Sequence, residues 1–200
     1  MSKTYWSELS DEQLMRILAS GHSEPLGELY IRHSAMVKDA MMRFCPEISI
    51  AEAEEMVQDV FLVLNRKASK YREQMKFKAW VYGIAVKTVS SWRRTYWLRR
   101  KLLDRHDNKH VGIAVKNTRN PAHDMEVRDT LTQGLEKLTA GQRDVLFLHA
   151  VEGFTGEEIA RILGIRPKTV WTRLHRARQR MLEELSTSES SQPAFCEGEA

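Results

Sequence analysis

The chain has 200 residues, with 31 lysines and arginines against 27 aspartates and glutamates, so its formal net charge is +4. This length allows one or two domains that each bury a core. The two cysteines are far apart and neither belongs to a CxxC pair, which argues against a zinc site and fits a reducing compartment. No apolar run approaches a membrane span, and the N-terminus lacks the apolar core of a signal peptide. We expect a cytoplasmic protein with no membrane insertion of its own.

Helical patterns dominate the first hundred residues, and alternating strand patterns are absent. Ser10 is the predicted N-cap of a helix that Gly21 ends. Pro25 opens a second predicted helix, which Pro46 closes. A third begins near Ser49, and the polar segment 66–76 after it is a predicted loop. The apolar face of this third helix comprises Ala53, Met56, Val57, Val60, Phe61 and Leu64.

The stretch 77–105 is a predicted helix that interleaves aromatic and basic residues. A helical projection at about 100° per residue places its apolar residues on one side. Trp80 and Trp92 lie on that side and are predicted core residues. A basic, aromatic helix can hold a phosphate backbone and stack on unpaired bases. The alternative is an amphipathic helix whose arginines are merely solvated, but a tryptophan among arginines is hard to explain as packing. The predicted outward residues are Tyr82, Lys87, Ser90, Arg93, Arg94 and Trp97.

The predicted fold is all-α, with two small helical domains joined by a flexible linker. The first domain spans 1–103 and the linker spans 104–122, where glycine, asparagine and histidine occur without steady periodicity. The second domain spans 123–185 and contains one helix ending near Thr139 and another over 140–151. The last segment, 186–200, is polar and acidic, which predicts a disordered tail.

The segment 154–182 predicts a helix-turn-helix. Thr155 and Glu158 form a capping box, Gly164 ends the first helix and Pro167 opens the second. In this motif the second helix enters the major groove of DNA, where arginine reads guanine and threonine contacts the thymine methyl group. The alternative is an ordinary helical hairpin with a basic face. The outward residues, with Trp171 on the flank, are Lys168, Thr169, Trp171, Thr172, Arg173, Arg176 and Arg180.

Three segments together resemble the extracytoplasmic-function group of bacterial sigma factors, from about Asp11 to Leu185. They are AEEMVQDVFLVLNRK, FKAWVYGIAVKTVSSWRR and LTAGQRDVLFLHAVEGFTGEEIARILGIRPKTVWTRLHRARQRM. The resemblance implies that the first segment binds the clamp helices of core RNA polymerase. The residues expected to do so are Glu55, Gln58, Asp59, Phe61 and Leu62.

The resemblance also assigns both DNA contacts. The second segment would melt the promoter and read its −10 element. The loop before it, KASKYREQMK, would capture a flipped base, with Lys70 and Tyr71 as the walls of the pocket. The third would read the −35 element, with Arg173 and Arg176 setting base choice and Lys168 and Arg180 holding phosphates. The expected −10 residues are Lys70, Tyr71, Lys87, Ser90, Arg93, Arg94 and Trp97.

Several positions depart from the family pattern. Lys87 and Ser91 stand where asparagine and aspartate are usual, and Asn65 replaces a common tryptophan. Lys168 replaces a glycine and Trp171 replaces a lysine in the −35 helix. These departures concern promoter sequence more than function.

The expected function is that of an alternative sigma factor, with core RNA polymerase, promoter DNA and an anti-sigma factor as partners. The alternative is a stand-alone helix-turn-helix regulator that binds duplex DNA without polymerase. An enzyme is disfavoured, because the sequence has no HExxH, phosphate-binding glycine loop or nucleophile motif. We expect no cofactor and no metal.

Overall fold

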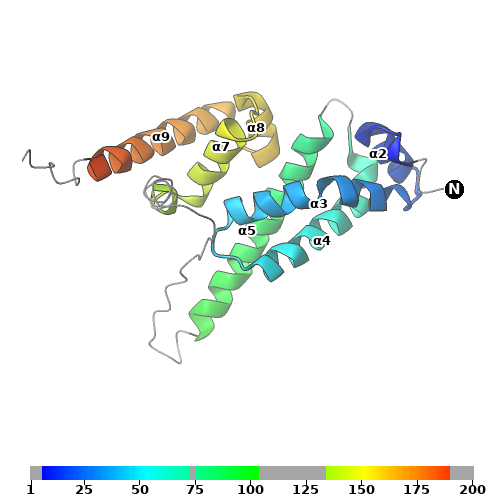
Figure 1. The fold of residues 1–200 in the computed structure, drawn as a ribbon, viewed down its shortest axis with the longest axis horizontal. Helices are drawn as coiled ribbons and strands as arrows, with labels where there is room; N and C mark the ends of the chain where they lie inside the picture. The colour runs from blue at the N-terminus through cyan, green and yellow to red at the C-terminus, as the bar shows by residue number, and fades with distance from the viewer. Residues whose placement is uncertain (1–5, 73–74, 104–133, 190–200) are drawn as a thin grey trace, which may run out of the picture. The chain divides into compact units, whose positions relative to one another are not determined.

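A computed structural model describes residues 6–72, 75–103 and 134–189 (Figure 1), and every element within these ranges is helical. The all-α prediction is therefore confirmed. The chain divides into two compact units: Met1–Val115 with Arg161–Gly164, and Lys116–Ala160 with Ile165–Ala200. The predicted linker, and most of the helix expected before Thr139, lie outside the described residues.

The first unit opens with helix α2, Asp11–Ala19, which is capped as predicted. The Ser10 hydroxyl accepts a hydrogen bond from the Gln13 backbone N–H at 3.3 Å, and the Gln13 side chain accepts one from the Ser10 N–H at 2.7 Å. These bonds satisfy N–H groups that lack partners within the helix. Gly21, at φ 99°, follows the helix in a left-handed conformation that suits glycine.

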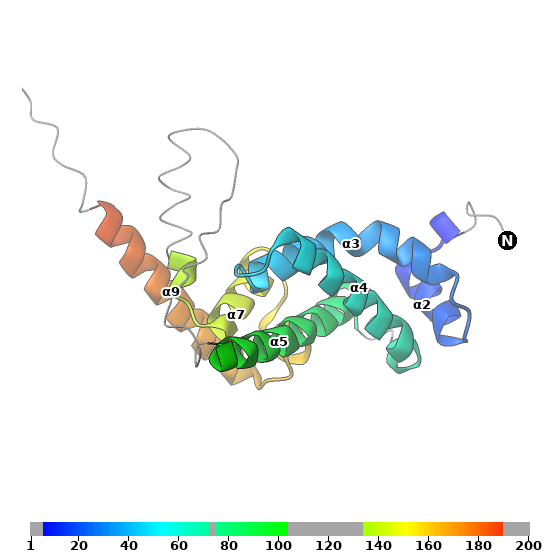
Figure 2. The same cartoon turned by 90° about the horizontal axis from the view of Figure 1, so that it is seen from below.

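Helices α3, Pro25–Phe44, and α4, Ile50–Lys67, pack together and against α5 (Figure 2). Ser49 caps α4 through a capping box with Glu52. All six predicted apolar residues of α4 are buried. The expected loop 66–76 is partly wrong, because α4 runs to Lys67 and the short 3-10 helix η1, Ala68–Lys70, follows it.

Helix α5, Phe77–Leu103, confirms the helical prediction but not its division into two faces. Tyr82, placed on the outward side from sequence, is only 1% exposed. Its ring packs edge-on against Phe44 of α3, with centroids 6.2 Å apart. The projection failed here because α5 contacts both α3 and α4 and so buries a wider arc than one stripe. Trp80 and Trp92, predicted as core, are half-buried.

Three helices follow in the second half of the chain: α7, Ala140–Ala150, α8, Gly156–Leu163, and α9, Pro167–Glu189. They belong to the second unit except for the last three residues of α8, which fall in the first. The predicted turn between α8 and α9 is confirmed: Gly164 has φ 66°, and the Ile165 N–H donates to the Ala160 carbonyl at 3.0 Å. Helix α9 continues to Glu189, so residues 186–189 of the predicted tail are helical, while 190–200 lie outside the described residues.

Neither a membrane-spanning helix nor a metal-binding cluster occurs among the described residues. No helix there is both long enough and apolar enough to cross a membrane. The same residues hold no group of three or more histidine, cysteine, aspartate or glutamate side chains suited to a metal ion.

Candidate polymerase and nucleic-acid interfaces

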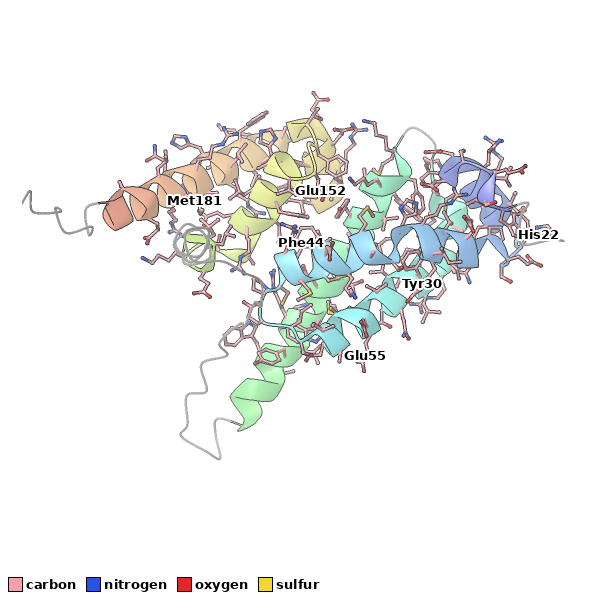
Figure 3. The ribbon with its side chains drawn as sticks, viewed as in Figure 1. His22, Tyr30, Phe44, Glu55, Glu152 and Met181 are labelled. Atoms are coloured by element: carbon pink, nitrogen blue, oxygen red, sulfur yellow. The ribbon has the colours of Figure 1, made fainter. Side chains whose placement is uncertain are left out.

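The outward edge of α4 combines acidic and apolar side chains. Glu55 (Figure 3), Gln58 and Asp59 are exposed. Leu62 is 57% exposed, so these four predicted contact residues are accessible. We call them the α4 edge. Phe61 is different, since it is 3% exposed and packs edge-on against Tyr30 of α3 with ring centroids 4.9 Å apart. It is a packing residue of this unit and offers no surface to a partner.

A hollow of about 640 Å³ lies between α4 and α5. Lys87 lines it together with carboxylates of α4, whose negative charge disfavours a phosphate there. The rings of Trp92 and Tyr96 stack at 4.8 Å, with an interplanar angle of 13°, and line the same hollow. Lys87 thus differs in its surroundings from the other predicted −10 residues. The α4 acids that line the hollow are Glu52, Glu55 and Asp59. Ser91 of α5, which stands where the family usually has aspartate, lines it as well.

The solvent-exposed residues of α5 that could contact DNA lie nearer its C-terminal end. Arg94 is exposed, Trp97 is 62% exposed, and the Trp97 ring meets Tyr96 edge-on at 6.3 Å. A tryptophan with that much exposed surface can stack on a base. Ser90 and Arg93 are half-buried: the Ser90 hydroxyl donates to the Val86 carbonyl at 2.8 Å, and the Arg93 guanidinium donates to the Phe44 carbonyl. Both polar groups are therefore engaged within the unit.

The loop before α5 is supported from inside by Tyr71. This side chain, predicted to wall a base pocket, is 9% exposed, and its ring lies 5.2 Å from that of Trp80 and 6.5 Å from that of Phe77. Its hydroxyl donates to the Met75 carbonyl at 3.1 Å. Little of the Tyr71 side chain is therefore accessible to a base, whereas Lys70 is exposed; their role as the wall of a base pocket stays a prediction.

Cys45 lies beside the Arg93 contact and is fully buried. Its thiol donates to Glu47 Oε2 at 3.1 Å. Burial raises the pKa of the Cys45 thiol to about 12, with the hydrogen bond to Glu47 and the charge of that carboxylate acting in the same direction. The thiol is accordingly protonated at neutral pH.

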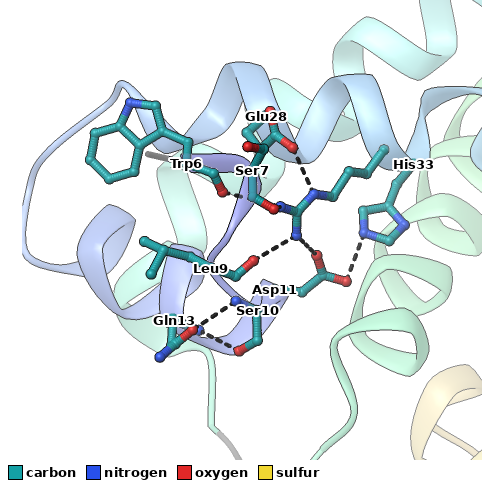
Figure 4. A network of polar contacts seen from close by, with 9 residues as sticks. Trp6, Ser7, Leu9, Ser10, Asp11, Gln13, Glu28 and His33 are labelled. Carbon is teal, nitrogen blue, oxygen red and sulfur yellow. Dashed lines mark hydrogen bonds and ion pairs between the residues drawn. The ribbon is translucent and has the colours of Figure 1, made fainter. Parts of the chain in front are cut away.

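A polar network that sequence reasoning missed joins the N-terminal segment to α3 (Figure 4). The Arg32 guanidinium donates to the carbonyls of Leu9, Ser7 and Trp6 at 2.8, 2.9 and 3.1 Å. It also pairs with Glu28 and Asp11, and Asp11 Oδ2 lies 2.8 Å from His33 Nε2. Only the Glu28–Arg32 spacing of four residues was visible as a local signal.

Two arginines of α9 are turned toward α7. A Cβ built on Gly141 would lie 2.8 Å from Arg173 Nη1 and 3.0 Å from its Cζ, so the guanidinium rests directly on that glycine. Arg180 Nη1 donates to the Lys137 carbonyl and to Gln142 Oε1, each at 3.2 Å. Both residues, predicted as DNA contacts, hold α9 against the start of α7.

The remaining face of α9 is exposed to solvent. Lys168, Thr172 and Arg176 are exposed, Trp171 is 53% exposed, and Thr169 is half-buried. His175 is exposed on the same face and was missed, although it lies three and four residues beyond Thr172 and Trp171. A helix end that combines cations with an aromatic ring suits the major groove.

Two family models match this chain: Sigma-70 region 2 over residues 29–100 and Sigma-70, region 4 over residues 128–181. The ECF RNA polymerase sigma-E factor of Escherichia coli strain K12 is 27% identical over 179 residues, which cover 86% of this chain and 92% of that protein. The chain belongs to the extracytoplasmic-function sigma factors. It is an alternative sigma factor that initiates transcription, as the resemblance implied.

Other relatives of this sigma factor agree. The RNA polymerase sigma factor CnrH of Cupriavidus metallidurans is 27% identical over 181 residues, which cover 87% of this chain and 93% of that protein. A solved structure of CnrH with the cytosolic domain of CnrY has a TM-score of 0.60 at 25% identity, covering 88% of this chain and 97% of the other. A co-crystal structure of the sigma factor RpoE with the anti-sigma factor NepR, from Bartonella quintana, also has a TM-score of 0.60 at 25% identity, covering 78% and 96%.

Proposed function

We propose that this sigma factor binds core RNA polymerase through the α4 edge and promoter DNA through α5 and α9. The proposal rests on two exposed apolar side chains whose surrounding charges are negative on α4 and positive on α5. Leu62 lies among the acids of α4, whereas Trp97 lies beside Arg94 on α5. Exposed apolar groups mark interaction surfaces, and the sign of the surrounding charge selects the partner. The basic surface suits DNA and the acidic surface suits a protein.

Promoter opening would depend on both DNA surfaces. Helix α9 would read the −35 element, with Lys168 and Arg176 supplying positive charge. Arg94 and Trp97 would hold the unpaired strand at the −10 element, and Lys70, in the short helix η1 before α5, would supply further positive charge. Stacking on an aromatic ring contributes about 1–3 kcal/mol per base, comparable with the cost of unstacking one base. Binding energy alone could then keep a short bubble open, so the chain would need neither nucleotide hydrolysis nor catalytic groups of its own.

The proposed division of labour follows the two units. Residues 1–103 would carry polymerase binding and −10 recognition, and residues 123–185 would carry −35 recognition, with 104–122 as the connection between them. The proposed location is the cytoplasm, where the polymerase works.

Regulation by an anti-sigma factor is the third part of the proposal. CnrH and RpoE, two sigma factors of similar fold, have been captured with CnrY and with the anti-sigma factor NepR. An anti-sigma factor would inhibit this chain by covering the α4 edge or a DNA-binding surface. The exposed apolar side chains of these surfaces would then be unable to bind polymerase or promoter.

The experiment that tests the proposal compares transcription with and without core polymerase on a randomised promoter library. We expect specific initiation only when the full-length chain and the core enzyme are both present. Selected promoters should share two conserved elements at −35 and −10. Tight sequence-specific binding by the chain alone, with no gain in initiation, would contradict the proposal and favour a stand-alone regulator.

A further inference from the structure

We propose that Trp171 recognises the 5-methyl group of a thymine in the −35 element. This inference rests on the proposed function, which places the N-terminal half of α9 in the major groove. It adds a chemical identity for one base of the promoter and names the side chain that selects it.

The Trp171 ring is held in a fixed position by its neighbours. A Cβ built on Gly156 would lie 2.7 Å from Cζ2 and 2.9 Å from Cε2 of the indole, so the ring occupies space that only a glycine leaves free. The His149 ring meets the indole edge-on, with centroids 6.1 Å apart and an interplanar angle of 75°. His149 is itself fixed, because its Nδ1 bonds to the Phe154 carbonyl at 3.1 Å and must carry the hydrogen.

The orientation of the ring decides what it can offer to DNA. The same built Cβ would lie 3.2 Å from Trp171 Nε1, so the N–H side of the indole is turned onto Gly156. Trp171 is nevertheless 53% exposed as a residue, and with the N–H side turned inward the part left for a partner is largely hydrocarbon. Such a surface favours an apolar contact over a hydrogen bond.

The neighbouring residue has the same character. The Thr172 side chain is exposed, but its hydroxyl donates to the Lys168 carbonyl at 2.9 Å. The hydroxyl hydrogen is thus occupied, so the side chain offers DNA its methyl group and no hydrogen-bond donor. Trp171 and Thr172 together form an apolar patch between the cations Lys168 and Arg176.

Thymine is the base that fits this patch. In the major groove each base pair presents hydrogen-bond donors and acceptors, and the thymine methyl group is the apolar feature. Cytosine offers a donor at the adjacent position and has no methyl group. A hydrocarbon surface pressed against guanine or adenine would leave their N7 acceptors without partners.

The test removes only the methyl group. A −35 element is first selected from a randomised library with the full-length chain and core polymerase, and each thymine in it is then replaced by deoxyuridine. At one thymine we expect binding to weaken about fourfold, the effect of withdrawing one buried methyl group. Trp171→Ala should bind both duplexes equally, so that the deoxyuridine effect disappears.

Two further variants make the test specific. Gly156→Ala keeps Trp171 but displaces its ring. It should therefore reduce the loss of binding caused by deoxyuridine. Leu182→Ala removes another exposed apolar side chain of α9, 64% exposed, and should leave the effect intact. Circular dichroism melting of each full-length variant confirms that it is folded.

The outcomes separate this inference from the proposed function. A selected element without thymine, or a deoxyuridine effect that persists in Trp171→Ala, overturns the inference alone. If Lys168→Ala and Arg176→Ala also leave affinity for the −35 duplex unchanged, α9 is not the reading helix and the proposed function fails as well.

Discussion

Arginines that look equivalent in the sequence of α9 have different surroundings in the fold. Arg173 rests on Gly141, whereas Arg176 is exposed beside His175. An arginine reads guanine only when its guanidinium can reach the base edge in a bidentate geometry. The structure therefore favours Arg176 over Arg173 for base reading, while the sequence alone did not distinguish them.

Replacing each arginine with alanine tests this difference. Arg176→Ala should cost about 1–3 kcal/mol in −35 binding and relax selectivity at one base pair. Arg173→Ala should keep the pattern of base preferences and lower the melting temperature of the full-length chain. Binding to a panel of single-base −35 variants measures both. Uniform weakening by Arg176→Ala across the panel would assign it to a phosphate instead.

The buried thiol of Cys45 predicts a dependence of stability on alkaline pH. Its pKa is raised from an ordinary 9.0 to about 12 in the folded state, so the folded chain binds this proton more tightly than the unfolded chain. The stabilisation is fully present below pH 9 and is lost between about pH 9 and 12, at up to about 1.4 kcal/mol per pH unit. Urea unfolding of the parent and Cys45→Ala, compared at pH 8 and pH 10.5, isolates the effect. An equal loss of stability in both proteins would show that other groups are responsible.

Local signals at element ends predicted the helices well. Ser10, Ser49 and Thr155 begin helices through bonds to a residue three positions later, and such bonds depend only on neighbouring sequence. Gly21 and Gly164 were identified as stops for the same reason, since a left-handed residue after a helix favours glycine.

Packing between elements could not be predicted in the same way. Tyr71 lies in a polar stretch of sequence and Tyr82 fell on the outward side of the helical projection, yet both are buried against rings contributed by other helices. Arg180 likewise reads as a free cation until α7 is placed beside α9. The burial of individual side chains within the predicted segments thus depended on contacts that the sequence alone does not show.

Two glycines provide a matched test at the level of the helices. Gly164 has φ 66°, so Gly164→Ala should destabilise the α8–α9 turn by about 1–2 kcal/mol. Gly27 lies in α3 with no atom near a built Cβ, and Gly27→Ala should be neutral or stabilising by up to about 1 kcal/mol. Denaturant unfolding of both full-length variants gives the comparison. Similar destabilisation by both substitutions would contradict this explanation.

Strand opening involves the whole complex of chain, polymerase and promoter. Trp97→Ala should leave closed-promoter binding intact and reduce open-complex formation about tenfold, if one stacked base contributes about 1–3 kcal/mol. Permanganate reactivity of unpaired thymines measures opening. A template with a pre-melted −10 region should restore transcription by the variant, because stacking is no longer needed to open the duplex.

The adjacent residue supplies the control for that experiment. Leu98 is 62% exposed, as is Trp97, but has no ring to stack on a base. Leu98→Ala should therefore open promoters normally. A defect of equal size in both variants, or failure of the pre-melted template to rescue Trp97→Ala, would rule out stacking as the role of Trp97.

The Arg32 network limits how far the chain can be truncated from its N-terminal side. The match to Sigma-70 region 2 begins at residue 29, yet every described partner of the Arg32 guanidinium precedes that residue. A fragment starting there would keep the cation and discard its acceptors, which include three backbone carbonyls. We therefore expect the folding unit to reach back at least to Trp6, so that unfolding of a truncation series loses cooperativity once it passes that point.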